Sequence, residues 1–358
     1  MPKNAGTFEV IYTAATTAYA NADKSGKLTV DGKEYAAADT ILGALANLGT
    51  EGGTVYFKGT HTDMTSIIAA TAGMKNITFR GVDETSLIEF PANVWLKADT
   101  TFENMKFKRT SGGASAPYIY ANGYTLTIGK AGDPVIPARV SPDGTSENGI
   151  ETLGHTSGKK SDFIINSGKY GNVGLVNYGA ATHASDVTIT VNDAQSIAAN
   201  KIRAFCSGTG TVNANVVYTI NGGTFDNKKF NDIGATVNGN SIIVFNNGMA
   251  QGMEATAFKY VVNAPANIKV AATSFGNAST APTFTLTPAE GVEKVFVNKA
   301  EVLPVNGVYT YTPSATGTFV VEADLVLPAI TFDTSDATSS TITNIRVTSY
   351  VYFSKRQI

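Results

Sequence analysis

A short phrase recurs in the second half of the sequence. A strand with alternating apolar residues ends in an apolar residue, an asparagine follows, and one to three small residues come next. The phrase occurs as DFIINSGKY, VTITVNDAQ, VYTINGGTF and SIIVFNNGM. Its asparagines are Asn166, Asn192, Asn221 and Asn246, which recur about every 25 residues. A repeat of this length, holding alternating strands and a small-residue turn, is typical of a chain wound into stacked coils.

The same shape can be followed toward the N-terminus in TVYFKGT, NITFRGV, NMKFKRT and TLTIGKA. The last apolar residues of these strands are Phe57, Phe79, Phe107 and Ile128, and they predict four earlier coils. The next interval is longer and contains GDPVIPARVSPDGTSENG, whose proline and glycine do not suit a regular strand. We therefore expect residues 132–149 to form a loop that projects from one coil.

Composition supports an all-β protein with a substantial core. Hydrophobic residues make up 43% of the 358 residues, charged residues only 16%, and glycines number 35. A net charge of −2 gives no electrostatic reason to expect a nucleic-acid partner, and no apolar run is long enough to span a membrane. The single cysteine, Cys206, excludes a disulfide framework within the chain and is expected to be a small buried residue.

Residues 1–50 are expected to form strands and a capping helix. Asp31 and Gly32 predict a tight turn between two short strands. In AADTILGALANLGTEGG the apolar residues lie at helical spacing, Asp39 can cap the first turn, and Gly49 can end the helix. Such a helix would cover the apolar end of the first coil. The opening residues MPKNAGTFEV lack a hydrophobic secretion signal, so the signal was removed or the protein is not exported by that route.

A resemblance extends this prediction. The run ILGALANLGTEGGTVYFKGTHTD, continued by MKNITFRGVDETSLIEF, resembles the N-terminal cap and first rungs of right-handed parallel β-helix proteins of the pectin-lyase-like superfamily. The INGGTF phrases look like those of large surface proteins of Gram-positive gut bacteria, and phage tailspikes contain similar runs. The resemblance covers roughly residues 37–253 and implies a right-handed parallel β-helix over 51–254. It does not select an activity, because enzymes, adhesins and spikes share this fold.

The sequence pattern changes after the last repeat. Residues 255–329 contain alternating strands every 8 to 12 residues, broken by proline and glycine, which predicts an immunoglobulin-like β-sandwich. The phrase VNGVYTYTP resembles modules appended to bacterial surface proteins. The tail, residues 330–358, contains one further strand pattern, TITNIRVTSYVYF. A terminal strand of this kind can close its own sheet or join a neighbour's, so a homo-oligomer or strand exchange through residues 341–353 is possible.

The recurring asparagines predict a structural ladder. Equivalent residues of stacked strands lie about 4.8 Å apart, so the amides of Asn166, Asn192, Asn221 and Asn246 can hydrogen-bond one to the next.

The earlier coils carry Lys58, Arg80 and Lys108 in what the pattern predicts to be the same slot. Like charges stacked at this spacing repel each other, so they should be splayed, paired with acids or facing an anion. Asp63, Asp83, Glu84, Glu89 and Glu103 are available partners. We expect a salt-bridged solvent face, with a strip that binds an anionic glycan or wall polymer as the alternative.

The densest aromatic patch contains Trp95, Tyr118, Tyr120 and Tyr124. Exposed rings would form a platform for sugar rings, whereas aromatic residues that alternate along strands more often pack inward.

Signals for catalysis are weak. Asp162 and Asp186 could be neighbours and form the carboxylate pair of a glycosidase, but both follow serine at a strand start, where a turn or cap role is more usual. The coils around Asp193 offer no further acids for a Ca²⁺ site, and the three histidines lack metal-type spacing. We expect no metal and no cofactor.

The sequence thus predicts a non-catalytic structural or adhesive module of a bacterial surface protein, extracellular and with glycan binding as its candidate activity. One alternative is a polysaccharide lyase or hydrolase acting on an acidic polysaccharide. The other is a phage tailspike or fibre, located in a virion.

Overall fold

The computed structural model describes residues 15–325 apart from residues 91, 111–118, 131–152, 155–158, 160, 171–181, 184, 197–201, 204, 206–209, 227 and 232–235. Residues 1–325 form one compact unit, and the fold below is that of its described part. The predicted loop at 132–149, Tyr118, Cys206 and the predicted strand at 341–353 lie outside the described residues.

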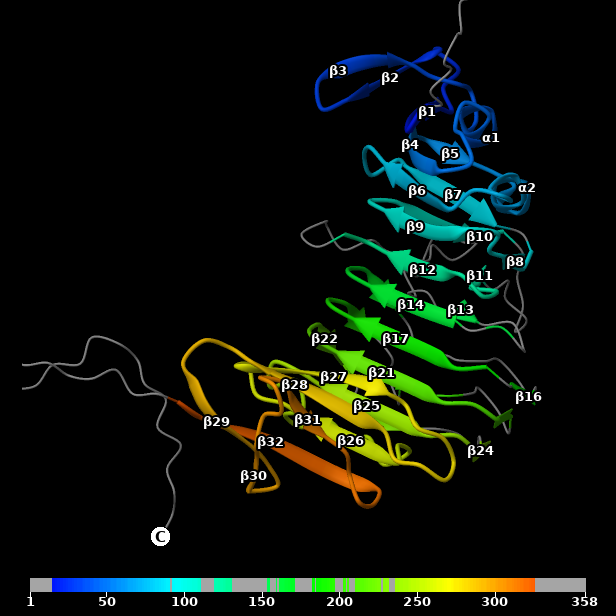
Figure 1. The fold of residues 1–358 in the computed structure, drawn as a ribbon. Coiled ribbons are helices and arrows are strands. Elements are labelled where there is room, and N and C mark those ends of the chain that lie inside the picture. Colours follow the sequence, from blue (N-terminus) through cyan, green and yellow to red (C-terminus); the bar gives the residue numbers. More distant parts are fainter. Residues whose placement is uncertain are drawn as a thin grey trace, which may run out of the picture. The chain divides into compact units, whose positions relative to one another are not determined.

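A 13-stranded sheet organises the chain, and most of its strands are parallel (Figure 1). Its parallel strands, in spatial order, are β1 (Thr17–Asn21), β4 (Gly52–Lys58), β6 (Asn76–Gly81), β9 (Asp99–Glu103), β12 (Thr125–Ile128), β14 (Ser161–Ile165), β17 (Val187–Val191), β21 (Val216–Ile220), β25 (Ser241–Phe245), β26 (Tyr260–Asn263) and β32 (Gly317–Leu325). The antiparallel strands β29 (Val292–Val297) and β30 (Ala300–Val302) complete one edge. Spatial order follows chain order as far as β26, so successive passes of the chain stack on each other.

Between these passes the chain crosses smaller parallel sheets. They are β5 (Thr60–His61) with β7 (Leu87–Phe90) and β10 (Lys106–Arg109); β8 (Val94–Trp95) with β11 (Ile119–Tyr120) and β13 (Leu153–Gly154); β15 (Lys169–Tyr170) with β18 (Gln195–Ser196) and β22 (Thr224–Phe225); β16 (Thr182–His183) with β20 (Thr211–Val212) and β24 (Thr236–Val237); and β19 (Ile202–Arg203) with β23 (Phe230–Asn231). The all-β prediction is confirmed, and the long parallel sheet is compatible with a β-helix-like fold. The handedness stays a prediction.

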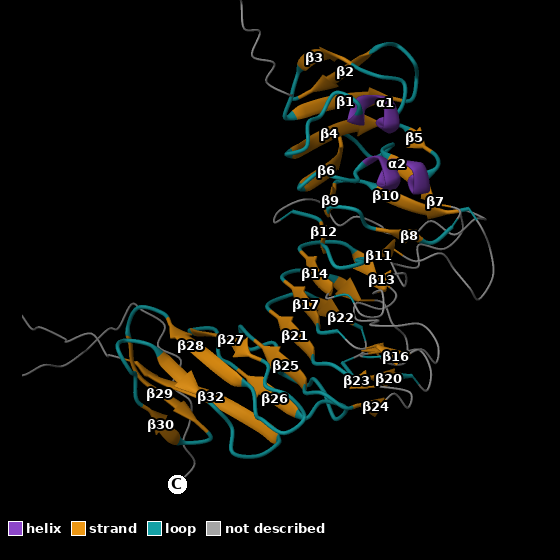
Figure 2. Ribbon diagram, turned by 45° about the vertical axis from the view of Figure 1, so that its right-hand side comes forward, coloured by secondary structure: helices purple, strands orange, loops and turns teal. Residues whose placement is uncertain are grey.

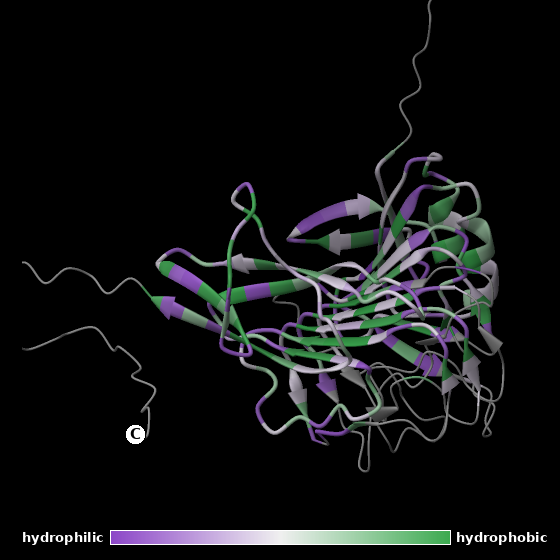
Figure 3. Ribbon diagram, turned by 60° about the horizontal axis from the view of Figure 1, so that its bottom comes forward, coloured by the Kyte–Doolittle hydropathy of each residue, from purple (hydrophilic) through white to green (hydrophobic). Residues whose placement is uncertain are grey.

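Buried and half-exposed residues alternate along the main strands, and the buried ones form the core. Phe79, Phe102, Ile128 and Ile165 stand in one register file and are all buried, while the residue that precedes each of them in the chain is half-exposed. The rings of Phe79 and Phe102 stack with centroids 5.5 Å apart. Hydrophobic residues, green in Figure 3, lie in the strands of the main sheet and in the helices. Burying this continuous apolar interior is the main force that holds the coils together.

The predicted register of the early coils is wrong. Phe79 pairs with Val55 rather than with Phe57, and the next strand is β9, which contributes Phe102. Phe107 lies instead on β10, in a smaller sheet, opposite Ile88. In the strand of residues 99–103 the last apolar residue, Phe102, is followed by Glu103, and an asparagine, Asn104, comes only one position later, so the strand does not match the repeat pattern.

Two short helices lie beside the first coils (Figure 2). Helix α1 (Ile41–Leu45) buries Ile41, Ala44 and Leu45, and its N-cap is Thr40, whose hydroxyl accepts the Gly43 N–H at 3.0 Å. The prediction of Asp39 as the cap is therefore wrong by one residue, and the helix ends at Leu45 with Ala46 as its C-cap, before Gly49. Whether α1 caps the stack stays a prediction.

The second helix, α2 (Met64–Ala70), was not predicted from the sequence. It begins after Asp63, whose carboxylate accepts the Ser66 N–H at 3.2 Å. Neither helix, nor any other in the described ranges, has the length and hydropathy needed to cross a membrane.

The predicted turn at Asp31 and Gly32 is confirmed. These residues join β2 (Lys27–Val30) to β3 (Lys33–Ala36) in an antiparallel hairpin, and both have positive φ angles, 49° and 77°.

The segment predicted as a sandwich divides between two sheets. Strands β26, β29, β30 and β32 extend the main sheet, while β27 (Ile268–Ser274), β28 (Thr283–Pro288) and β31 (Tyr309–Tyr311) form an antiparallel sheet of three strands. A second apolar cluster includes Val270 and Phe284 of the small sheet and Ile242 and Val244 of β25. An immunoglobulin-like sandwich over 255–329 is therefore not confirmed, because part of the segment continues the coil sheet.

Candidate aromatic binding site

The four asparagines of the repeat form a hydrogen-bonded chain. Asn192 donates to the Asn166 side chain at 2.7 Å, Asn221 to Asn192 at 2.7 Å, and Asn246 to Asn221 at 2.8 Å. The chain starts at the carbonyl of Gly129, which accepts from Asn166 at 3.1 Å. The side-chain amides of Asn166, Asn192 and Asn221 each bond through both oxygen and nitrogen to neighbouring coils, so these residues join successive coils and leave few groups for a ligand.

The three cations Lys58, Arg80 and Lys108 do not share a slot. Arg80 pairs in register with Tyr56 and with Glu103, whereas Lys108 lies on β10 opposite Glu89. Each cation has an acidic partner among those the sequence offered: Lys58 meets Asp83 at 3.0 Å, Lys108 meets Glu89 at 3.0 Å, and Arg80 contacts Glu103. The prediction of a single file of cations is wrong, because the early register was misassigned.

The carboxylates that could have formed a glycosidase pair have partners of their own. Asp162 accepts the Thr188 hydroxyl, and Asp186 accepts the backbone N–H and side-chain amide of Asn215 at 2.9 and 3.1 Å. Within the described ranges no three His, Cys, Asp or Glu side chains come together in a way that could hold a metal ion.

Trp95 and Tyr120 form the candidate site. The two residues are register partners on β8 and β11, and their rings stack at a centroid distance of 5.1 Å with an interplanar angle of 7°. Trp95 is 43% exposed, and burial raises the pKa of the Tyr120 phenol, which therefore stays neutral at physiological pH. Tyr120 covers one face of the indole.

The other face of Trp95 is open because β8 is the edge strand of its sheet, whose order is β13, β11, β8. In the preceding coil this position is occupied by helix α2 rather than by another strand, so none of the described residues pairs with Trp95 on that side. A helix is wider than a strand and meets the sheet only along one stripe. A hollow is left between the helix and the indole.

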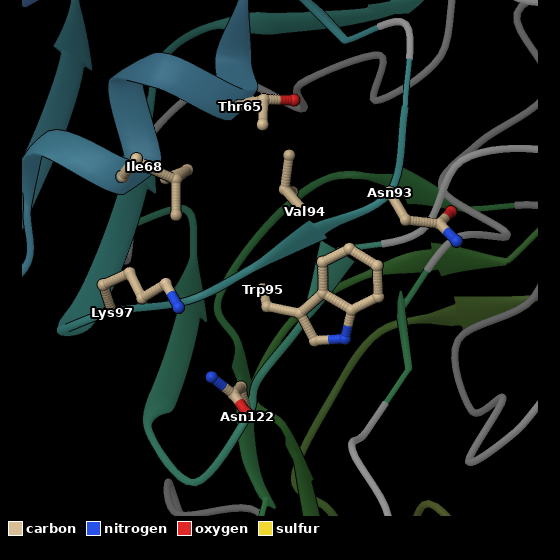
Figure 4. Close-up of a pocket in the computed structure, with 8 residues that line it drawn as sticks. Thr65, Ile68, Asn93, Val94, Trp95, Lys97 and Asn122 are labelled. Atoms are coloured by element: carbon tan, nitrogen blue, oxygen red, sulfur yellow. The ribbon is translucent and has the colours of Figure 1, made fainter.

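This hollow has a volume of about 270 Å³. Thr65, Ile68 and Ala69 of α2 line one side, and the segment with Asn93, Val94, Trp95 and Lys97 lines the other, with Asn122 from the next coil (Figure 4). Asn122 is fixed by a hydrogen bond from its side-chain amide to the carbonyl of Leu96 at 3.0 Å. An apolar wall, one open aromatic face and several polar groups are the usual components of a small-molecule site.

A second aromatic group lacks such an open face. Tyr19 stacks on Tyr35 at 4.3 Å and on Tyr56 at 5.8 Å, and the Lys33 ammonium lies 5.2 Å from the centre of the Tyr35 ring. The faces of these rings are turned toward each other or toward a cation, so mainly their edges reach the solvent. They are a poorer platform for a flat ligand than Trp95.

The sequence pointed to Trp95 and Tyr120 but missed Thr65, Ile68, Lys97 and Asn122. A signal for the helix was present, because Asp63 is followed by Met64, Ile67 and Ile68 at helical spacing. Neither Lys97 nor Asn122 carries a signal of its own.

No known protein family matches the sequence, and neither a curated protein nor a solved structure is found to be similar.

Proposed function

We propose that this chain is a non-catalytic, glycan-binding module of an extracellular bacterial surface protein, and that it binds one sugar ring against the open face of Trp95. The observation that carries the proposal is the half-exposed indole, held flat by Tyr120 on one side and facing a hollow on the other.

The chemistry of a sugar ring suits this site. The apolar C–H face of a pyranose can stack on the electron-rich face of an indole, and the ring hydroxyls then need polar partners around the rim. Asn93, Asn122 and Thr65 supply amide and hydroxyl groups at this rim. The volume of the hollow, about 270 Å³, lies just below the smallest volumes usual for small-molecule sites, roughly 300 Å³, which suits a single sugar residue.

Catalysis is left out of the proposal because none of the described residues that line the hollow has a carboxylate. Asp162 and Asp186, in addition, are hydrogen-bonded to Thr188 and Asn215 of the neighbouring coils. The Trp95 platform would give adhesion, and the stacked coils would serve as the rigid support that presents it.

For the architecture we infer a right-handed β-helix of the pectin-lyase-like kind, with α1 as its cap and the sheet β27, β28, β31 as part of a sandwich. Support comes from the near-universal right-handedness of connections between parallel strands of one sheet. An experimental structure tests each of these points.

The binding test is a glycan array probed with the wild-type chain and with Trp95→Ala, Trp95→Phe and Tyr56→Ala. We expect Trp95→Ala to abolish binding, Trp95→Phe to weaken it, and Tyr56→Ala to leave it unchanged, since Tyr56 belongs to the tyrosine stack. The proposal would be overturned if the wild-type chain bound no glycan on the array, or if Trp95→Ala bound as well as the wild type.

A further inference from the structure

We infer that the sugar bound at Trp95 carries an anionic group, a carboxylate or a sulfate, and that Lys97 pairs with it. This inference rests on the proposed function, whose site it makes more specific.

Lys97 is placed to act together with Trp95. The two residues are separated only by Leu96, which is fully buried, so both project outward from the same side of the chain in this extended segment. Both line the hollow beneath α2 (Figure 4). A sugar stacked on the indole would therefore have the Lys97 ammonium at its edge.

The charge of Lys97 is uncompensated within the described part of the chain. No carboxylate there lies within ion-pair distance of its ammonium, and no acidic residue lines the hollow. By contrast, Lys58, Arg80 and Lys108 each contact an aspartate or glutamate. A single unpaired cation beside a neutral aromatic wall favours an anionic ligand over a neutral one and disfavours a cationic one.

The expected contribution is modest because Lys97 is exposed to solvent. An exposed ion pair changes affinity by about two- to fivefold, and salt screens it. Lys97 therefore provides selectivity between sugars, while stacking on Trp95 provides most of the affinity.

The test uses dextran, carboxymethyl-dextran and dextran sulfate, which share one backbone and differ in charge. Trp95 is the only tryptophan in the chain, so tryptophan fluorescence, excited at a wavelength that the 15 tyrosines do not absorb, reports on this site alone. The variants are Lys97→Gln and, as a matched control, Lys269→Gln, because Lys269 is also exposed but lies on β27, in the antiparallel sheet. Binding is titrated at about 20 mM and at about 300 mM NaCl, which differ severalfold in Debye length.

We expect the wild-type chain to prefer at least one charged dextran over the neutral one at low salt. Lys97→Gln should lower this preference about two- to fivefold, and Lys269→Gln should not. Preference for carboxymethyl-dextran identifies a carboxylate ligand, and preference for dextran sulfate a sulfate ligand.

Equal preference in wild type and Lys97→Gln, with fluorescence still responding to the dextrans, would overturn the role of Lys97 and leave the Trp95 platform standing. Absence of any fluorescence response, together with a silent glycan array, would overturn the platform itself. The two failures are thus distinguishable.

Discussion

Asn246 and Val270 exchange two hydrogen bonds. The Asn246 side-chain amide donates to the Val270 carbonyl at 3.0 Å, and the Val270 N–H donates to the Asn246 side-chain oxygen at 2.8 Å. Both residues are buried. The asparagine ladder that joins the coils therefore ends on β27, a strand of the antiparallel sheet, and ties the two parts of the chain together.

Replacing Asn246 with alanine should lower the free energy of unfolding by about 1–3 kcal/mol, because the Val270 N–H would be left buried without a partner. Urea denaturation followed by circular dichroism measures the change. Asn192→Ala is the matched control: Asn192 belongs to the same ladder but is exposed, so water can replace the lost amide. Equal losses in the two variants would contradict this assignment.

The asparagine ladder also shows which part of the register can be predicted from the sequence. In the later coils a strand, an asparagine and a small residue recur at a nearly constant interval, and the four amides named from that pattern do bond in succession. In the early coils the matching phrases carry Lys58, Arg80 and Lys108 where the later phrases have asparagine, so the register was predicted from large apolar residues alone. Phe57 and Phe107 are buried, as are the residues that do share the register of Phe79, so an apolar residue at the end of a strand does not by itself identify the register.

The open face of Trp95 could not be predicted for a different reason. It depends on the preceding coil having a helix where later coils have a strand, which is a property of two segments together. No pattern within residues 93–97 carries that information.

Gly129 marks the start of the ladder, and replacing it with alanine should be strongly destabilising. A Cβ there would lie 1.9 Å from the Ser167 hydroxyl oxygen and 2.8 Å from the Ser167 backbone nitrogen, and the φ angle is +78°. Gly73→Ala is the control, because Gly73 has a similar φ of +86° and no atom within 4 Å. We expect a loss of about 1 kcal/mol for Gly73→Ala and a clearly larger loss for Gly129→Ala, by thermal or urea unfolding.

Arg80 and Glu103 are adjacent register partners with half-buried side chains. Arg80→Glu should destabilise the chain, because it places two carboxylates opposite each other on neighbouring strands. The double variant Arg80→Glu with Glu103→Arg should recover most of the loss, and a double-mutant cycle gives the coupling energy.

The same Arg80→Glu variant tests the alternative of a cationic strip. Since Arg80 is paired, its reversal should not weaken binding to polyanions, whereas Lys97→Gln should. Loss of polyanion binding by a folded Arg80→Glu variant would instead support the hypothesis of a cationic binding strip.

His61 should make stability depend on pH. It is buried, its Nδ1 accepts the Ile41 N–H at 3.4 Å, and its Nε2–H donates to the Lys58 carbonyl at 3.1 Å. Burial lowers the pKa of His61, so the unfolded chain takes up the proton first as the pH falls. The stabilising effect is complete above the unfolded pKa of about 6.5 and is lost as the pH falls below it, toward the folded pKa, with a slope of at most about 1.4 kcal/mol per pH unit.

Urea unfolding of the wild type and of His61→Gln between pH 8 and pH 5 measures this effect. The wild type should lose stability more steeply than the variant over the acid part of the range. Parallel profiles would show that His61 does not titrate on unfolding.

Strand β25 belongs to both apolar clusters at once. Ile243 and Phe245 face the interior of the coils, while Ile242 and Val244 face the antiparallel sheet. The two hydrophobic cores thus share one strand. Unfolding either core would expose the apolar side chains on one face of β25 to water. The coils and the C-terminal strands should therefore melt in a single transition, even though their repeat patterns look like two separate modules in the sequence.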